Sequence, residues 1–392
     1  MKKHKTPSLI IISAVALIMM ALTLVSCAGN GSSSTIEQIL SVIPDTLNNR
    51  TWVAINDYAQ MRKESQIHAP RTDATAEEQG VYLSDLFNMG LPNFDPLEFA
   101  APAGFVNNNY AYLIIGSLPA MHNLGLGYWS IDQEAAAGQP PTNVSILKGQ
   151  FDPEKARRAL AVSAKDDPPS TEVYGNNTIL SWGGENEVNL TKRFAPPAYD
   201  LLGRGGRFVF QNDYTFRTNT TPEIKLIVDT RKDKHASLAE VSEFSLMAKE
   251  LSSHGALAAV LSNQTQSVDY VRSKLVSSGQ YKAEDVDKYL AQGPRLLPYQ
   301  TIALGIAKDE EGLYALIILV HTDEQTAAKN VNLLQRRIGE TNSFFANNNW
   351  TFMIPSSSIT SHGRVLTAKL YGNIGRKWLG WYVKVDPLVL HE

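Results

Sequence analysis

The chain has 392 residues, with 36 lysines and arginines against 39 aspartates and glutamates, for a formal net charge of −3. Proteins that bind nucleic acid select strongly basic surfaces, so this balance argues against nucleic acid as a partner. Cys27 is the only cysteine, which excludes an intramolecular disulfide and a metal site built from several thiolates.

The N-terminal segment has the three-part layout of a secretory signal. Three lysines precede an uncharged, mostly apolar run from Leu9 to Leu24, and small residues follow it. The run ends in Leu24-Val25-Ser26-Cys27, which resembles the lipobox of bacterial lipoproteins. The resemblance implies that residues 1–26 are removed and that Cys27 is lipidated and becomes the new N-terminus.

Residues 28–34 are small and polar, and predict a flexible tether between the lipid and the folded body. Acyl chains on Cys27 would hold the protein permanently on the outer face of the cell membrane, or on the periplasmic side if an outer membrane exists. Three alternatives remain open. The run from Leu9 to Leu24 is only slightly short of a membrane span, ordinary signal cleavage could leave Cys27 incidental, or Cys27 could be a buried thiol.

Local signals predict helices and strands throughout residues 35–206. Capping-box patterns at 34–37 and 75–78 open two helices, and Pro153 after Asp152 marks the start of another. The predicted elements are a helix at 35–42, a strand at 51–55, a helix at 77–90, strands at 110–115 and 144–147, a helix at 152–162 and a hairpin at 172–182.

Local signals also predict helices and strands throughout residues 207–392. Its strongest signal is the turn Asp309-Glu310-Glu311-Gly312 between two apolar runs, which predicts a hairpin. The predicted strands are 207–210, 214–217, 257–261, 301–307, 313–320, 350–354, 365–371 and 378–385, and the predicted helices are 222–229, 237–251, 268–277, 283–291 and 324–338.

Strands outnumber helices and arrive in hairpins, which predicts an α+β fold with mainly antiparallel sheet and packed helices. Two internal matches suggest two related halves, 35–206 and 207–392. Residues 105–114 resemble 345–354, and the strand, aspartate and alanine-rich helix at 144–160 resemble those at 315–331. The alternative is that such turns and caps recur because their physics is common.

A further resemblance covers about residues 100–260. Pro140-Pro141, the run 144–152, the helix around Arg157 and the hairpin at Tyr174-Gly175 resemble a pattern in uncharacterised bacterial surface lipoproteins. It implies an extracytoplasmic α+β body and no known chemistry.

The search for chemistry finds no catalytic or metal-binding motif and no cofactor signature. The sequence has no G-x-S-x-G elbow, no H-x-x-x-H and no calcium loop. Aromatic side chains are the remaining candidates, because a rigid ring with a polar edge suits a sugar or peptide. We select Trp129, Trp350, Trp378 and Tyr382 as candidate ligand-binding residues, with core packing as the alternative.

These observations predict a lipid-anchored, non-enzymatic protein of the bacterial envelope with a binding or scaffolding role. Its partners would be the membrane, through the lipid, and an envelope protein, glycan or peptide. A solute-binding lipoprotein of a transporter is one alternative, although that class needs two lobes with parallel sheets. An envelope hydrolase with dispersed carboxylates is the other.

Overall fold

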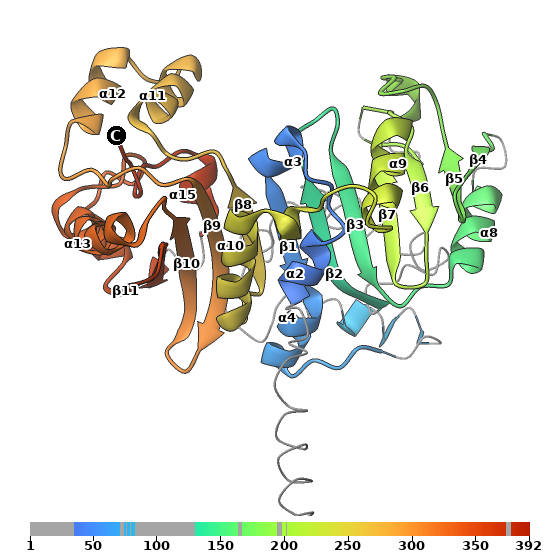
Figure 1. Cartoon of the computed structure of the whole chain (residues 1–392), viewed down its shortest axis with the longest axis horizontal. Coiled ribbons are helices and arrows are strands. Elements are labelled where there is room, and N and C mark those ends of the chain that lie inside the picture. The colour runs from blue at the N-terminus through green and yellow to red at the C-terminus, as the bar shows by residue number, and fades with distance from the viewer. Residues whose placement is uncertain are drawn as a thin grey trace, which may run out of the picture. The chain divides into compact units, whose positions relative to one another are not determined.

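The centre of the structure is one antiparallel sheet of twelve strands, in the order β11-β12-β10-β9-β8-β1-β2-β3-β7-β6-β5-β4 (Figure 1). The structure is a computed structural model, and it describes residues 35–70, 74–75, 77–78, 80–82, 130–163, 167–193, 198–200, 202–373 and 378–392. The strands are β1 Val53–Asp57, β2 Ile131–Ala137, β3 Val144–Gly149, β4 Ser170–Tyr174, β5 Asn177–Ser181, β6 Arg207–Phe210, β7 Tyr214–Thr218, β8 Ala258–Ser262, β9 Thr301–Asp309, β10 Gly312–Val320, β11 Ser356–His362 and β12 Val365–Tyr371.

Helices cover both faces of this sheet, so the predicted α+β class is confirmed. The helices are α2 Thr35–Leu40, α3 Leu47–Thr51, α4 Tyr58–Ser65, α8 Pro153–Ser163, α9 Thr221–Thr230, α10 Ser242–Ser253, α11 Val268–Ser277, α12 Ala283–Leu290, α13 Glu324–Glu340, α14 Trp350–Met353 and α15 Gly380–Val383, with 3-10 turns η2 Leu190–Lys192 and η3 Leu238–Glu240. One core cluster includes side chains of α2, α9 and α10, and the other includes side chains of α4, α8 and α13. None of the described helices is both long and apolar enough to cross a bilayer.

Most of the predicted local elements form. The hairpin around Asp309–Gly312 joins β9 to β10, and the hairpin around Gly175 joins β4 to β5. The capping box at Thr75 and Glu78 is present, with each residue accepting the other's main-chain N–H. The predicted strand at 110–115 lies outside the described residues.

Three predictions are wrong at the level of local structure. Residues 350–353 form α14 instead of a strand, because Asn349 caps a helix through a hydrogen bond from the Thr351 N–H to its Oδ1 (2.9 Å). Residues 380–383 form α15, so strand alternation does not apply there. The box at Ser237 caps η3, and α10 begins only after the extended residue Val241.

The strand order repeats within the sheet. The sequence β1-β2-β3-β7-β6 in the first part has the same connectivity as β8-β9-β10-β12-β11 in the second, with β4-β5 as an extra hairpin. After β3 and β10, Asp152 and Asp323 each accept a hydrogen bond from the N–H three residues later and open α8 and α13. This agrees with the predicted match between segments 144–160 and 315–331.

The two repeats meet where β1 pairs with β8. In this antiparallel pair, Ala54 lies opposite Val260, with Val53 opposite Leu261 and Ile55 opposite Ala259. The pair joins the two repeats into one continuous sheet.

The predicted boundary between residues 206 and 207 is misplaced. β6 pairs with β5 and β7 pairs with β3, so residues 207–218 belong to the first repeat. The repeats run from β1 to β7 and from β8 to β12, and the connection between them is residues 219–257. Residues 35–392 nevertheless form one compact unit, because the sheet is continuous.

Candidate binding site

A small cavity opens where β3 begins and α9 starts, and we call it the α9 pocket. Its volume is about 170 Å³. Its walls come from three segments that are far apart in the chain: α3 with the residues before it, the β2–β3 connection, and the first turns of α9. The lining residues are Pro44, Thr46, Asn48, Asn49, Thr142, Val144, Glu223 and Leu226.

Two amide side chains of this wall hold its segments together. Nδ2 of Asn48 donates to the main-chain oxygen and to the hydroxyl of Thr142, at 3.1 and 3.0 Å. Nδ2 of Asn49 donates to the carbonyl of Pro44 at 2.9 Å. Since an amide nitrogen has two N–H donors, both donors of Asn48 and one donor of Asn49 are used within the protein.

Glu223 is the exception among the polar lining residues. Its Oε2 atom is buried and has no hydrogen-bond partner among the described residues. Burial raises the pKa of this carboxyl group, a hydrogen bond from its own main-chain N–H lowers it, and the nearby Glu185 raises it. Among the described residues, this carboxylate makes no ion pair.

More unpaired acceptors lie next to Glu223 in the chain. Asn219 and Thr220, 2% and 7% exposed, each carry a buried side-chain oxygen without a partner among the described residues. The same holds for Asn143, which precedes the β3–β7 pair Val144–Thr218 and so lies at the same strand end as Asn219. Buried polar side chains with an unused hydrogen-bonding oxygen thus gather at this end of the sheet.

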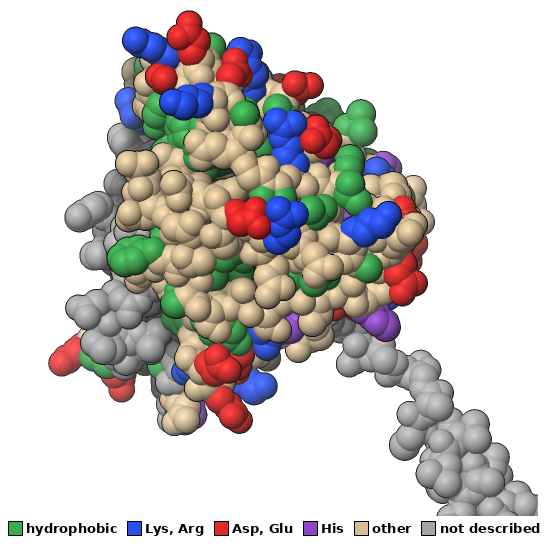
Figure 2. Space-filling view, turned by 90° about the vertical axis from the view of Figure 1, so that its left-hand side faces the viewer, with side chains coloured by type: hydrophobic (Ala, Val, Ile, Leu, Met, Phe, Trp, Pro, Cys, Tyr) green, Lys and Arg blue, Asp and Glu red, His purple; other side chains and the backbone are tan. Residues whose placement is uncertain are grey.

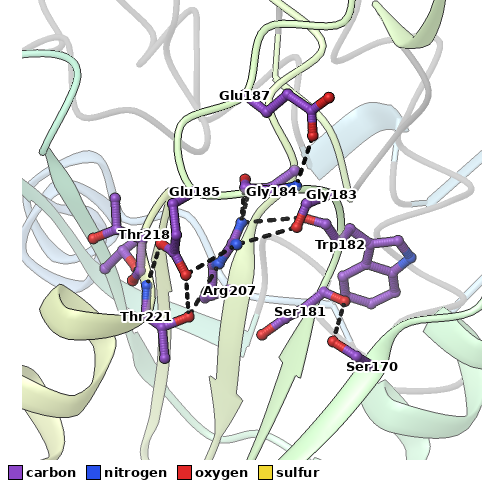
Figure 3. A network of polar contacts seen from close by, with 12 residues as sticks. Ser170, Ser181, Trp182, Gly183, Gly184, Glu185, Glu187, Arg207, Thr218 and Thr221 are labelled. Atoms are coloured by element: carbon purple, nitrogen blue, oxygen red, sulfur yellow. Dashed lines mark hydrogen bonds and ion pairs between the residues drawn. The ribbon is translucent and has the colours of Figure 1, made fainter.

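Arg207 fixes in place the loop after β5, which contacts the start of α9 (Figure 3). Its side chain is 3% exposed. Nη1 donates to the carbonyls of Trp182 (3.0 Å), Gly205 (2.9 Å) and Gly184 (3.2 Å), and Nη2 donates to that of Gly183 (3.1 Å). One guanidinium thus ties residues 182–184 to the start of β6.

Glu185 connects this loop to the start of α9. It accepts an ion-pair contact from Nη2 of Arg207 at 3.2 Å. Its other contacts are with Thr221, from the N–H at 2.8 Å and from the hydroxyl at 2.6 Å. Thr220, the N-cap residue, makes no side-chain cap, so Glu185 takes over that role and positions the turn that holds Glu223.

The close approach of strands around Arg207 requires glycine at position 205. A Cβ there would lie 1.9 Å from the carbonyl oxygen of Trp182. We expect Gly205→Ala to lower the free energy of unfolding by about 1–3 kcal/mol, because main-chain atoms must move apart. The matched change Gly339→Ala on α13, where a Cβ meets nothing within 4 Å, should instead stabilise by about 0.5–1 kcal/mol. Urea unfolding of both variants tests the contrast, and equal effects would contradict it.

Of the residues selected from the sequence, those that the structure describes do not line the α9 pocket. Leu24, Val25, Ser26, Cys27 and Trp129 lie outside the described residues. Trp350 and Trp378 are both 0% exposed and belong to the hydrophobic core, so they offer no free ring face to a ligand.

Tyr382 is half-buried. It stacks on Trp52 with ring centroids 6.4 Å apart, and its hydroxyl donates to the carbonyl of Gln264 at 3.0 Å. Core packing, the alternative, explains Trp350 and Trp378, because large apolar rings gain more free energy from burial than from exposure. A binding role of Tyr382 stays a prediction.

In the described part of the chain, no three His, Cys, Asp or Glu side chains are grouped to hold a metal ion. On the face shown in Figure 2, basic and acidic side chains are interspersed. Pairs such as Arg272–Asp287 (2.6 Å) satisfy such charges locally.

No protein-family model and no curated protein matches the chain. Solved structures of TP0453 are similar to it at low levels. Crystal form III has a TM-score of 0.35 and 8% identity, covering 88% of this chain and 97% of that one. Crystal form I has a TM-score of 0.34 and 9% identity, covering 90% and 98%. These values carry no functional argument.

Proposed function

We propose that the chain is a lipid-anchored, extracytoplasmic protein of a bacterial envelope, with a non-catalytic binding role centred on the α9 pocket. The observation that carries this proposal is the tetrapeptide Leu24-Val25-Ser26-Cys27 after an uncharged, mostly apolar run. The pocket supports the binding role, because it pairs a small cavity with polar groups whose hydrogen bonding is incomplete.

No observation specifically favours either alternative function. Solute-binding proteins of transporters need parallel sheets around a cleft, whereas every pair between the described strands is antiparallel, in one sheet. Glu172, Asp213 and Glu240, the dispersed carboxylates, do not line the α9 pocket. We therefore carry forward only the binding role.

Cys27→Ser tests the anchor. We expect the wild-type chain to incorporate labelled fatty acid in a bacterial host and to fractionate with membranes, and the variant to lose the label and keep residues 1–26. Mass spectrometry of the N-terminal peptide reads both outcomes. Ser33→Ala in the tether is the matched control and should be processed normally. An unmodified Cys27 in the mature wild-type chain would refute the proposal.

A further inference from the structure

We propose that the α9 pocket binds a primary ammonium group on a short aliphatic stem, with Glu223 as its counter-ion. This rests on the proposed binding role and names the chemical class of the ligand. A lysine side chain and a free alkyl diamine both present this group.

The hydrogen-bonding groups of the pocket favour a positively charged ligand. Glu223 is the charged residue of the lining, and its Oε2 atom is buried without a hydrogen-bond partner in the described chain. An ammonium group has three donors and no acceptor. It can therefore donate to the carboxylate of Glu223, whereas a carboxylate or phosphate ligand would place a second anion beside it.

The electrostatic surroundings point the same way. Glu185, in the loop after β5, lies close enough to Glu223 to raise the pKa of its carboxyl group, so two carboxylates lie at the start of α9. Arg207 pairs with Glu185 and with four carbonyls. A bound cation would complete the pairing at this helix start.

The size of the pocket limits the ligand to one side-chain-sized group. A volume of about 170 Å³ is close to that of a cavity that holds one benzene molecule, and below the roughly 300–1,000 Å³ of pockets for larger ligands. Val144, Leu226 and Pro44 provide an apolar wall. A stem of about four methylenes suits this wall, with the charged end at Glu223.

The test is an NMR titration of the full-length chain in detergent micelles, with labelled valine and leucine methyl groups. The probes are n-butylammonium, n-butanol and butyrate, which share a stem and differ in charge. We expect n-butylammonium to bind with a Kd on the order of millimolar, as befits a fragment. It should shift the methyl resonances of Val144 and Leu226, and the other two probes should bind at least about tenfold more weakly.

Glu223→Gln should reduce the affinity for n-butylammonium about tenfold or more while leaving the fold intact, because glutamine has the same shape and removes a partly desolvated charge. Glu284→Gln is the matched control, since Glu284 also lies in the first turn of a helix, α12, but away from the pocket. Methyl spectra of each free variant report on folding. Equal binding of n-butanol and n-butylammonium, or unchanged binding by the Glu223 variant, would overturn the inference.

A last pair of probes separates the two sources of the ligand. Tighter binding of Nα-acetyl-lysine amide than of 1,5-diaminopentane would assign the pocket to lysine side chains of a peptide or protein, and the reverse order would assign it to free diamines. Neither result depends on lipidation of Cys27. The anchor and the ligand class can therefore fail independently.

Discussion

Replacing Arg207 with methionine is expected to lower the free energy of unfolding by about 3–5 kcal/mol, the range typical of removing one partner of a buried charged pair. Methionine fills similar space but donates no hydrogen bond. Four carbonyls, of Trp182, Gly183, Gly184 and Gly205, would lose a charged donor. Glu185 would lose its ion-pair partner at the start of α9. Urea unfolding at constant pH measures the loss.

Two further variants give this prediction its specificity. Arg207→Lys should fall between wild type and Arg207→Met, because one ammonium with three donors cannot reach all four carbonyls. Arg272→Met removes an exposed ion pair with Asp287 and should leave the unfolding midpoint unchanged within error. If the Arg207 and Arg272 variants unfold at the same urea concentration, the network does not stabilise the fold.

Local structure was readable from the sequence wherever the determinant is local. The turn at Asp309–Gly312 marks its hairpin, and Asp152 and Asp323 mark the starts of α8 and α13. These signals depend on residues within a few positions of one another, so the local sequence is enough to find them.

The arrangement of strands in the sheet depends on contacts that no local pattern records. β1 pairs with β8 across about two hundred residues, and β7 pairs with β3 after an inserted hairpin. The boundary at 206/207 was misplaced for this reason: sequence signals show hairpins one at a time, but not which hairpin lies next to which.

Two aromatic segments that the sequence pattern assigns to strands form short helices instead. A strand rich in tryptophan and tyrosine exposes every second ring, whereas the short helices α14 and α15 let Trp350 and Trp381 turn into the core. The cap at Asn349 decides this locally, but an asparagine before an aromatic run is equally compatible with a turn before a strand.

The α9 pocket had no sequence signal of its own. Glu223 follows Thr221-Pro222 at a helix start. Acidic residues are common there because their negative charge interacts favourably with the helix dipole. Only the pairing of β3 with β7 brings Val144 and Thr142 close to Glu223. The cavity is therefore a property of the folded chain.

The second large effect is expected from the pH dependence of Asp386. This side chain is 3% exposed, and burial raises its pKa from 3.8 to about 6 despite hydrogen bonds from the Ser343 hydroxyl (2.5 Å) and the Phe344 N–H (2.8 Å). The folded state thus holds its proton more tightly than the unfolded state. Its stabilising contribution is complete below pH 3.8 and is lost as the pH rises through about 6, a change of about 3 kcal/mol.

Asp386→Asn isolates this contribution from those of the other carboxylates. The asparagine Oδ1 can accept from Phe344 N–H, and its Nδ2 can donate to the Ser343 oxygen, so the contacts survive without a charge. The variant should therefore gain stability relative to wild type by about 3 kcal/mol between pH 4 and pH 7. Asp386→Ala leaves the Ser343 and Phe344 donors buried without an acceptor and should be destabilised across this range. A constant difference between wild type and Asp386→Asn from pH 4 to pH 7 would mean that Asp386 is already ionised throughout, held by its two donors more strongly than burial opposes it.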